Sequence, residues 1–217
     1  RRRHTRSFHV TGVQTCALPI SDGHTLLMAA LGNMVLQPIL SKNGGGELVE
    51  KLKPVGTIST APHVLVISSK LPIKNVQELI DYAKANPGQI SFASAGTGGT
   101  AHLGMEMFKM LSGTDVLHVP YKGGSQAVTD LIGGQITCYF AAMSTGLPLA
   151  KSGRLRAVAV TSPRRFSAVI PEVPTVAESG LPGYELVGWF GLMIPASTPA
   201  EIVARANAVA VQALRAP

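Results

Sequence analysis

Residues 92–103 read Phe92-Ala-Ser-Ala-Gly-Thr-Gly-Gly-Thr-Ala-His-Leu103 and join a short apolar run to a helical stretch through a glycine-rich loop. The loop holds three glycines, Gly96, Gly98 and Gly99, flanked by the hydroxyl residues Ser94, Thr97 and Thr100. Glycine lets the backbone approach a ligand closely, and the unpaired N–H groups at a helix start carry partial positive charge. We therefore predict a loop that binds an anion, either a carboxylate or a phosphate. The alternative is a strand-to-helix turn that Thr100 caps and that binds nothing.

Two further segments resemble this loop, because each follows an apolar run and contains glycine. The first is Val119-Pro-Tyr-Lys-Gly-Gly-Ser125, in which Tyr121 and Gly123 are candidate ligand contacts and Lys122 is expected to be solvated. The second is Ala141-Ala-Met-Ser-Thr-Gly146. Loops that leave the same edge of an open α/β sheet form its ligand sites, so we expect all three segments to lie together.

The chain as a whole alternates short apolar runs with stretches of helical period, which predicts an α/β fold. The predicted strands are Thr25–Ala29, Val55–Ile58, Val64–Ser68, Ile90–Ala93, Val116–Val119, Ile136–Ala141 and Arg156–Thr161. The predicted apolar helix faces are Val76, Leu79, Ile80 and Ala83, then Leu103, Met107, Met110 and Leu111, then Ala127, Val128, Leu131 and Ile132. The strand-like runs are apolar on both faces, as expected for a sheet covered by helices.

Two later segments carry the sequence of a capping box, Thr175-Val-Ala-Glu178 and Thr198-Pro-Ala-Glu201. Each predicts a helix start, because the paired side chains would satisfy N–H groups that the first turn leaves open. The last helix would carry one apolar side, formed by Ile202, Val203, Ala206, Val209, Ala210 and Ala213.

Two extended runs, Ala61–Ser68 and Leu186–Ile194, lie on either side of the central α/β block. We predict that they form two antiparallel strands, one entering this block and one leaving it. A hinged protein with two lobes needs such a pair of connections.

The net charge of the 217-residue chain is +7, which would suit an anionic partner such as nucleic acid. However, four of the 19 basic residues, Arg1, Arg2, Arg3 and Arg6, lie in the first six positions. The rest of the chain is close to charge balance, so we expect no nucleic-acid partner. No stretch from Ser21 onward is long and apolar enough to span a bilayer.

The run Val10-Thr-Gly-Val-Gln-Thr-Cys-Ala-Leu-Pro-Ile20 resembles the in-frame translation of a common sequencing-library adapter. We therefore treat residues 1–20 as non-native and expect any signal peptide to lie upstream of Ser21. Cys138 is then the only cysteine, which excludes a disulfide and a cysteine-based metal site. Because Cys138 lies in an apolar run, we expect its thiol to be buried and unreactive.

Two nucleotide-binding motifs share this glycine pattern, but the residues around the loop do not match either of them. The loop matches the dinucleotide pattern G-x-G-x-x-G/A, but Asp115 precedes the next strand, whereas the ribose-binding acid should follow it. No Lys-Ser/Thr pair follows the glycines, so the loop is no P-loop. His102 and Glu106 lie one helical turn apart without a third ligand, so we expect a side-chain pair and no metal. We predict no catalysis and no cofactor.

Eight segments, in this order, resemble the Bug-type solute receptors of tripartite tricarboxylate transporters. They are Asp22–Met28, Ala83–Gly88, Ser91–Leu103, His118–Gly123, Leu131–Gln135, Lys151–Ser162, Val173–Gly183 and Trp189–Leu192. The resemblance implies a two-lobe, type II periplasmic-binding-protein fold of the Venus-flytrap kind. The first lobe would comprise residues 21–67 and 191–217, and the second lobe residues 68–190.

The resemblance also implies a function and a ligand site. The protein would be a periplasmic monomer that binds a small carboxylate and delivers it to the permease subunits of a transporter. The implied ligand residues are Ser94, Ala95, Gly96, Thr97, Gly98, Gly99, Thr100, His102, Tyr121, Gly123 and, from the other lobe, Gly32 and Asn33.

Some family features are missing from this sequence. The first strand of the family and its Pro/Gly-rich ligand loop would lie upstream, so we expect an incomplete first lobe and weak or no binding by this chain alone. Family members often carry an acid where this chain has Thr137. The sequence leaves two other functions open, a sensory effector-binding domain of the same shape and an enzyme that binds a nucleotide. It does not specify the carboxylate, because backbone donors recognise charge rather than a carbon skeleton.

Overall fold

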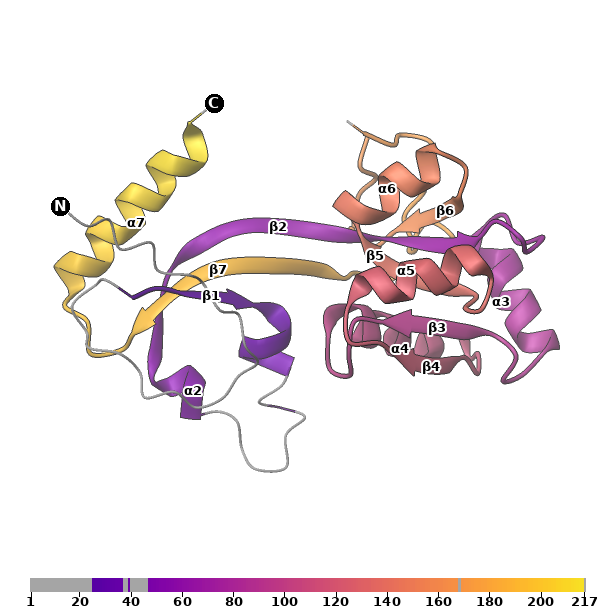
Figure 1. Ribbon diagram of the computed structural model, residues 1–217, viewed down its shortest axis with the longest axis horizontal. Coiled ribbons are helices and arrows are strands. Elements are labelled where there is room, and N and C mark those ends of the chain that lie inside the picture. The colour runs from indigo at the N-terminus through magenta and orange to yellow at the C-terminus, as the bar shows by residue number, and fades with distance from the viewer. Residues whose placement is uncertain (1–24, 37–38, 40–46, 168, 217) are drawn as a thin grey trace.

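The computed structural model describes residues 25–36, 39, 47–167 and 169–216 (Figure 1). Within this part of the chain the strands are β1 (Leu27–Ala30), β2 (Leu52–Ser68), β3 (Ser91–Ser94), β4 (Leu117–Pro120), β5 (Cys138–Ala142), β6 (Leu155–Val160) and β7 (Val187–Pro195). The helices are a short π-helix η1 (Gly32–Leu36), α2 (Glu47–Glu50), α3 (Val76–Ala85), α4 (Thr100–Ser112), α5 (Gly124–Gly133), α6 (Met143–Lys151) and α7 (Ala200–Arg215). The predicted α/β alternation is confirmed.

Two long strands, β2 and β7, connect the two lobes of the molecule (Figure 1). They pair antiparallel from Leu52 opposite Pro195 to Pro62 opposite Val187, which confirms the predicted antiparallel connection. From His63 onward, β2 pairs with β5 and β6 instead. We call the part built on β1, η1, α2, β7 and α7 lobe 1, and the part from α3 to β6 lobe 2. The residue limits predicted for the lobes stay a prediction.

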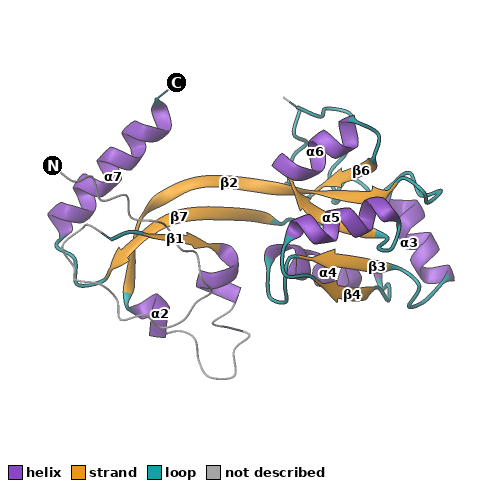
Figure 2. Ribbon diagram, in the orientation of Figure 1, coloured by secondary structure: helices purple, strands orange, loops and turns teal. Residues whose placement is uncertain are grey.

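Lobe 2 is a five-stranded mixed sheet flanked by the helices α3 to α6 (Figure 2). Its strands lie in the order β6-β2-β5-β3-β4, and β3 is parallel to both β4 and β5. The side chain of Asn75 caps α3 by accepting the Glu78 N–H at 2.8 Å. Helix α4 ends at Gly113, whose φ of 64° is a left-handed conformation that favours glycine. The core includes the fully buried Leu65, Phe92, Phe108, Phe140 and Tyr184.

The runs Val55–Ile58 and Val64–Ser68, predicted as two strands, form the single 17-residue strand β2. Residues 59–63 lie between these two runs, and pairing with β7 supplies backbone partners from Ser59 to Pro62. The register shifts near Gly56 and Ser59 accommodate its irregularities. Tertiary pairing thus extends a strand that its local sequence would have ended.

The segment Ala141–Gly146, predicted as a third loop, contains no loop. Ala141 and Ala142 complete β5, and α6 begins at the next residue, Met143. A Cβ on Gly146 would lie 2.5 Å from Cγ1 of Val64. Gly146 therefore serves close packing of α6 on the sheet, rather than access to a ligand.

The predicted apolar face of α4 was wrong, whereas those of α3 and α5 are confirmed. Met110, one of the predicted face, is 75% exposed. The buried positions of α4 are instead Ala101, Gly104, Met105, Phe108 and Ser112. A Cβ on Gly104 would lie 2.4 Å from Cδ2 of Leu186, so small residues bring this side of the helix close to its neighbours. The large side chains of Met105 and Phe108 are fully buried on this face beside Gly104, whereas Met110 remains outside.

The two predicted capping boxes have different outcomes. Thr175 and Glu178 form the reciprocal bonds, at 2.9 and 3.0 Å, but turns follow them and no helix begins there. At the second box, Pro199 is the residue before α7, and no side chain caps the helix. Thr198 is buried, and its hydroxyl has no partner among the described residues. Helix α7 forms as predicted, but none of its described side chains is buried, and Val209 is 60% exposed.

Cys138 is fully buried at the start of β5, as predicted. Burial raises the pKa of its thiol to about 12, so the thiolate does not form near neutral pH. In the described part of the chain, no helix has the length and apolar character needed to cross a membrane. Cys16 and the segment 1–20 lie outside the described residues.

Candidate functional site

The predicted anion loop leaves lobe 2 at the carboxyl ends of parallel strands. Because β3 is parallel to β4 and to β5, the segments that follow these strands meet at one edge of the sheet. The N–H of Tyr121, in the loop after β4, donates to the carbonyl of Ser94 at 2.9 Å and joins the first two loops. Two of the three predicted loops therefore form a continuous edge, and α6 directly follows β5 beside them.

Helix α4 begins at this edge without a side-chain cap. Its N-cap residue is Gly99, and no side chain bonds to the first turn as a cap, so Thr100 does not act as the predicted alternative requires. Gly96 and Gly98 have φ values of 131° and 78°, which side chains with a Cβ rarely adopt. The loop thus depends on glycine both for its path and for the open start of the helix.

Several N–H groups of the loop already have internal acceptors. The N–H of Gly98 donates to Nδ1 of His102 at 3.1 Å, and that of Gly96 donates to the Ser94 hydroxyl at 3.3 Å. The N–H groups of Thr97, Thr100 and Ala101 have no acceptor within the described residues. The free donors are therefore those of one loop residue and the first helical turn, and the Gly98 amide is occupied.

Three stacked aromatic rings lie beside the loop, and two of them form hydrogen bonds with loop residues. His102 and His118 stack with their centroids 4.1 Å apart, and Phe92 stacks on His118 at 4.7 Å. His118 Nε2 lies 2.7 Å from the Ser94 hydroxyl, which itself donates to the Gly96 carbonyl at 3.0 Å. Since that hydroxyl has one proton, we assign the shared proton to His118 Nε2. Burial, and then the neighbouring His102, lower the pKa of His118, so the ring stays neutral at pH 7.

His102 faces Glu106 as an ordinary pair on one side of α4. Its Nε2 lies 4.0 Å from Oε1 of Glu106, which also contacts Nζ of Lys109 at 3.1 Å. Since His102 Nδ1 accepts a hydrogen bond from Gly98, its proton lies on Nε2, toward Glu106. No group of three metal-ligating side chains occurs in the described part of the chain.

Tyr121 contributes its ring and its backbone to the second loop. Its hydroxyl donates to Oδ2 of Asp130 at 2.7 Å, and burial together with this bond raises the tyrosine pKa to about 12. The next residues lead to Gly123, which precedes α5 and likewise provides no side-chain cap. Lys122 is exposed, as expected for a solvated lysine. The Tyr121 hydroxyl has thus committed its proton, and only its lone pair remains for a further partner.

Lobe 1 reaches this edge through Gly32 at the start of η1. A Cβ on Gly32 would lie 3.8 Å from the Gly98 carbonyl oxygen and 3.9 Å from Cα of Gly99. The backbones of the two lobes are therefore close at the start of α4. Asn33 follows in η1, but its side chain lies outside the described residues. Ala95 and Thr97 are exposed, whereas Ser94 is buried.

Sequence reasoning missed two residues beside the site. The parallel register of β3 and β4 places His118 opposite Phe92 and thereby beside the loop. The sequence alone shows only that the chain has a histidine at this position. Thr161 bonds His63 and Leu186, which are 98 and 25 residues away in sequence. No local pattern could have predicted these contacts.

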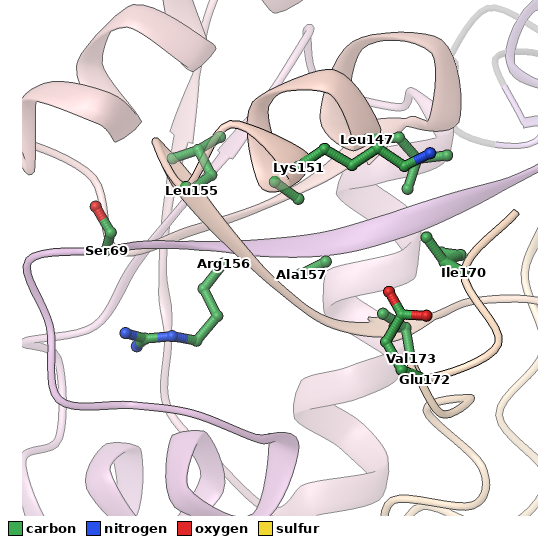
Figure 3. Close-up of a pocket in the computed structure, with 11 residues that line it drawn as sticks. Ser69, Leu147, Lys151, Leu155, Arg156, Ala157, Ile170, Glu172 and Val173 are labelled. Atoms are coloured by element: carbon green, nitrogen blue, oxygen red, sulfur yellow. The ribbon is translucent and has the colours of Figure 1, made fainter.

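A separate cavity of about 390 Å³ lies between α6, β6 and the segment around Ile170 (Figure 3). Its walls include Leu147, Leu155 and Val173, with Lys151 and Glu172 also contributing. The Arg156 guanidinium donates to the carbonyls of Leu71, at 3.0 Å, and Ile73. The Arg156 side chain is therefore bonded to the segment before α3. None of the predicted site residues lines the cavity.

Comparisons with known proteins identify the family of this chain and its fold. Residues 4–217 match the model of the tripartite tricarboxylate transporter family receptor. A protein from the tcbD–tcbE intergenic region of Pseudomonas sp. strain P51 is 36% identical over 212 residues, covering 96% of this chain and 62% of that protein. BugT of Bordetella pertussis is 36% identical over 204 residues, covering 91% of this chain and 61% of BugT. The chain thus spans about three fifths of these curated relatives.

Solved structures show the same fold. An R. palustris protein solved with adipate is 31% identical with a TM-score of 0.85, covering 91% of this chain and 66% of that one. MatC from Rhodopseudomonas palustris, solved with malate, is 28% identical with a TM-score of 0.80, covering 91% and 67%. These similarities confirm the two-lobe periplasmic-binding-protein fold. The chain belongs to the tripartite tricarboxylate transporter receptor family, whose Bug-type members its sequence resembles.

Proposed function

We propose that this chain is part of a periplasmic solute receptor that holds a small organic carboxylate between its lobes. The receptor delivers this ligand to membrane permease subunits, acts as a monomer, and neither catalyses a reaction nor needs a cofactor. The observation that carries the proposal is the open start of α4. There, the N–H groups of Thr97, Thr100 and Ala101 have no acceptor in the described part of the chain, and Gly32 of lobe 1 lies close by.

A carboxylate suits these donors better than a neutral ligand does. The N–H groups of a first helical turn point along the axis, and the helix dipole favours negative charge at this end. No acidic side chain lies in the first turn of α4 to neutralise that field. Two relatives were solved with adipate and with malate, dicarboxylates of different length. Donors that recognise the carboxylate itself would accept both.

A thermal-shift screen of the full-length protein tests the proposal. We expect adipate or malate to raise the melting temperature by about 5–10 °C at a hundredfold excess over Kd, since such binding stabilises by about 2.7 kcal/mol. A neutral diol of the same length, 1,6-hexanediol, serves as the control for adipate and should produce no shift. Equal shifts with diol and diacid, or none with any organic acid in the screen, would contradict the proposal.

Two variants locate the ligand at the loop. Thr97→Val removes an exposed hydroxyl, and Gly98→Ala places a Cβ on a residue with a φ of 78°, so both should abolish the carboxylate shift. Gly113→Ala is the matched control, because Gly113 has a φ of 64° at the opposite end of the same helix. Thr129→Val is the control for the hydroxyl, on the exposed side of α5. Unchanged shifts in both loop variants would mean that the loop is structural.

A further inference from the structure

One buried threonine lies where both connecting strands leave lobe 2. The last residue pair of β2 and β7 is Pro62 with Val187, and the next residues inward are His63 and Leu186. Between these two lies Thr161, which follows β6 and is fully buried. The N–H of His63 donates to the Thr161 hydroxyl at 2.7 Å, and that hydroxyl donates to the Leu186 carbonyl at 2.6 Å.

The backbone of Thr161 completes the same arrangement. Its N–H donates to the His63 carbonyl at 2.9 Å, and its carbonyl accepts from the Leu186 N–H at 2.8 Å. Thr161 therefore bonds the N–H and the carbonyl of both strand residues. At this point β6 takes over from β7 as a neighbour of β2. Such a change of partner leaves one donor and one acceptor open, and a hydroxyl can satisfy both.

This junction lies beside the candidate ligand site. Gly188 lies two residues after Leu186. A Cβ at this position would be in contact with Cε1 of His63, at 3.4 Å, and with Cγ2 of Thr100, at 3.8 Å. Thr100 is the first residue of α4. The strands that carry lobe 1 thus pass directly against the start of the helix that offers the free N–H groups. A small change in their direction would move Gly32 relative to Gly98 and Gly99.

We propose that Thr161 is the positioning residue of the hinge. Its hydroxyl fixes the direction in which β2 and β7 leave lobe 2, and thereby where lobe 1 meets the start of α4. Its effect on ligand affinity rests on the proposed function, whereas its effect on lobe placement does not. The hydroxyl contacts no ligand itself, because it is fully buried, its proton goes to a backbone carbonyl and it accepts a backbone N–H.

Three variants of the full-length protein separate the hinge from general stability. Thr161→Val keeps the shape of the side chain and removes the hydroxyl, whereas Thr161→Ser keeps the hydroxyl. Thr137→Val is the matched control, since Thr137 is buried in lobe 2 and its hydroxyl accepts a backbone N–H, that of Ser91, at 3.2 Å. Both valine variants should lower the melting temperature, and measurements are made where circular dichroism shows each variant folded.

Lobe placement is measured without ligand, as the distance between two spin labels, one on each lobe, determined by double electron–electron resonance. Labels on cysteines placed at the exposed Ser152 and Ala208 report this distance in a background without other reactive cysteines, where the buried Cys138 does not react. We expect a shifted or broadened distance distribution in Thr161→Val only. A distribution identical to the wild type would overturn the proposal, as would the same change in Thr137→Val.

Affinity for adipate and malate is the second measurement. We expect Thr161→Val to bind about tenfold more weakly, with wild-type affinity in Thr161→Ser and Thr137→Val. Wild-type affinity in Thr161→Val would overturn the link between hinge and ligand. If the wild type binds neither acid, these two probes give no support to the proposed function, and the spin-label distances still decide whether Thr161 positions the lobes.

Discussion

The described parts of lobe 2 and lobe 1 differ in the size of their buried clusters. Lobe 2 contains one contiguous buried cluster that joins its sheet to α3, α4 and α5. In lobe 1, the buried cluster among the described residues consists of Ala29, Met34 and Leu52, with Trp189 and Met193 packed against it. Several large apolar side chains of lobe 1 are exposed, namely Leu27, Met28, Phe190, Val209 and Leu214.

The difference bears on how a ligand site between lobes is built. The glycine loop, the ring stack and the start of α4 all rest on the core of lobe 2, so this half of the site is held rigidly. The other half is brought in by β2 and β7 from a lobe with a small described core. Preorganised donors on a rigid element lower the entropic cost of binding. Under the proposed function, lobe 2 would supply the anion recognition and lobe 1 would close over it.

The largest expected effect tests the core of lobe 2 directly. Phe140→Ala removes a fully buried ring of β5 and should lower the free energy of unfolding by about 3–5 kcal/mol. Leu214→Ala in α7 removes a side chain that is 52% exposed and should change it by less than about 0.5 kcal/mol. Urea unfolding followed by circular dichroism measures both. Equal losses would show that the two lobes are equally well packed.

A smaller effect compares how much stability each lobe loses when a methyl group is added at a closely packed glycine. Gly146→Ala in lobe 2 places a Cβ 2.5 Å from Cγ1 of Val64 and should cost about 1–3 kcal/mol of stability. Gly56→Ala in lobe 1 places a Cβ 3.0 Å from Nδ2 of Asn207, the end of a side chain on a helix without buried residues. Because moving that amide sacrifices only its hydrogen bond to the Val55 carbonyl, at 2.7 Å, this variant should cost about 1 kcal/mol. The reverse order of losses in urea unfolding would contradict the comparison.

The smallest effect concerns pH and the junction between the lobes. Burial lowers the pKa of His63, whose Nδ1 has no partner among the described residues, from its ordinary value of 6.5. The unfolded chain therefore takes up a proton at a higher pH than the folded chain does. Stability is then complete above pH 6.5 and falls as the pH drops toward 5.

His63→Asn removes this titration, so its loss of stability between pH 7 and pH 5 should be smaller than that of the wild type. Urea midpoints at the two pH values, at constant ionic strength, give the comparison. His118, whose pKa burial also lowers, retains part of the wild-type fall in this variant. Glu178, whose bond to the Thr175 N–H lowers its pKa, acts only below its ordinary value of 4.5 and does not interfere. An unchanged fall in His63→Asn would show that His63 is not held neutral by burial.

The amino-acid sequence by itself determined the α/β alternation, the loop from Ser94 to Thr100 and the antiparallel connection between lobes. The first two features depend on neighbouring residues, because periodicity and glycine placement are local properties of the chain. The connection was predicted from two extended runs, and its pairing joins residues far apart in the sequence. The sequence also predicted the burial of Cys138, whose flanking residues are apolar. It failed on α4, where two faces have the same period and the buried one meets Leu186, Tyr184 and Phe140.

Only the tertiary structure decided which groups of the site are free and which are used. The acceptor of the Gly98 N–H is a side chain only four residues later, but the Tyr121 proton and the Ser94 hydroxyl are committed through contacts between separate elements. Thr161 is the clearest case, since its partners come from β2 and from the residue before β7. Hydrogen bonds depend on distance in space, and a one-dimensional pattern does not contain that distance.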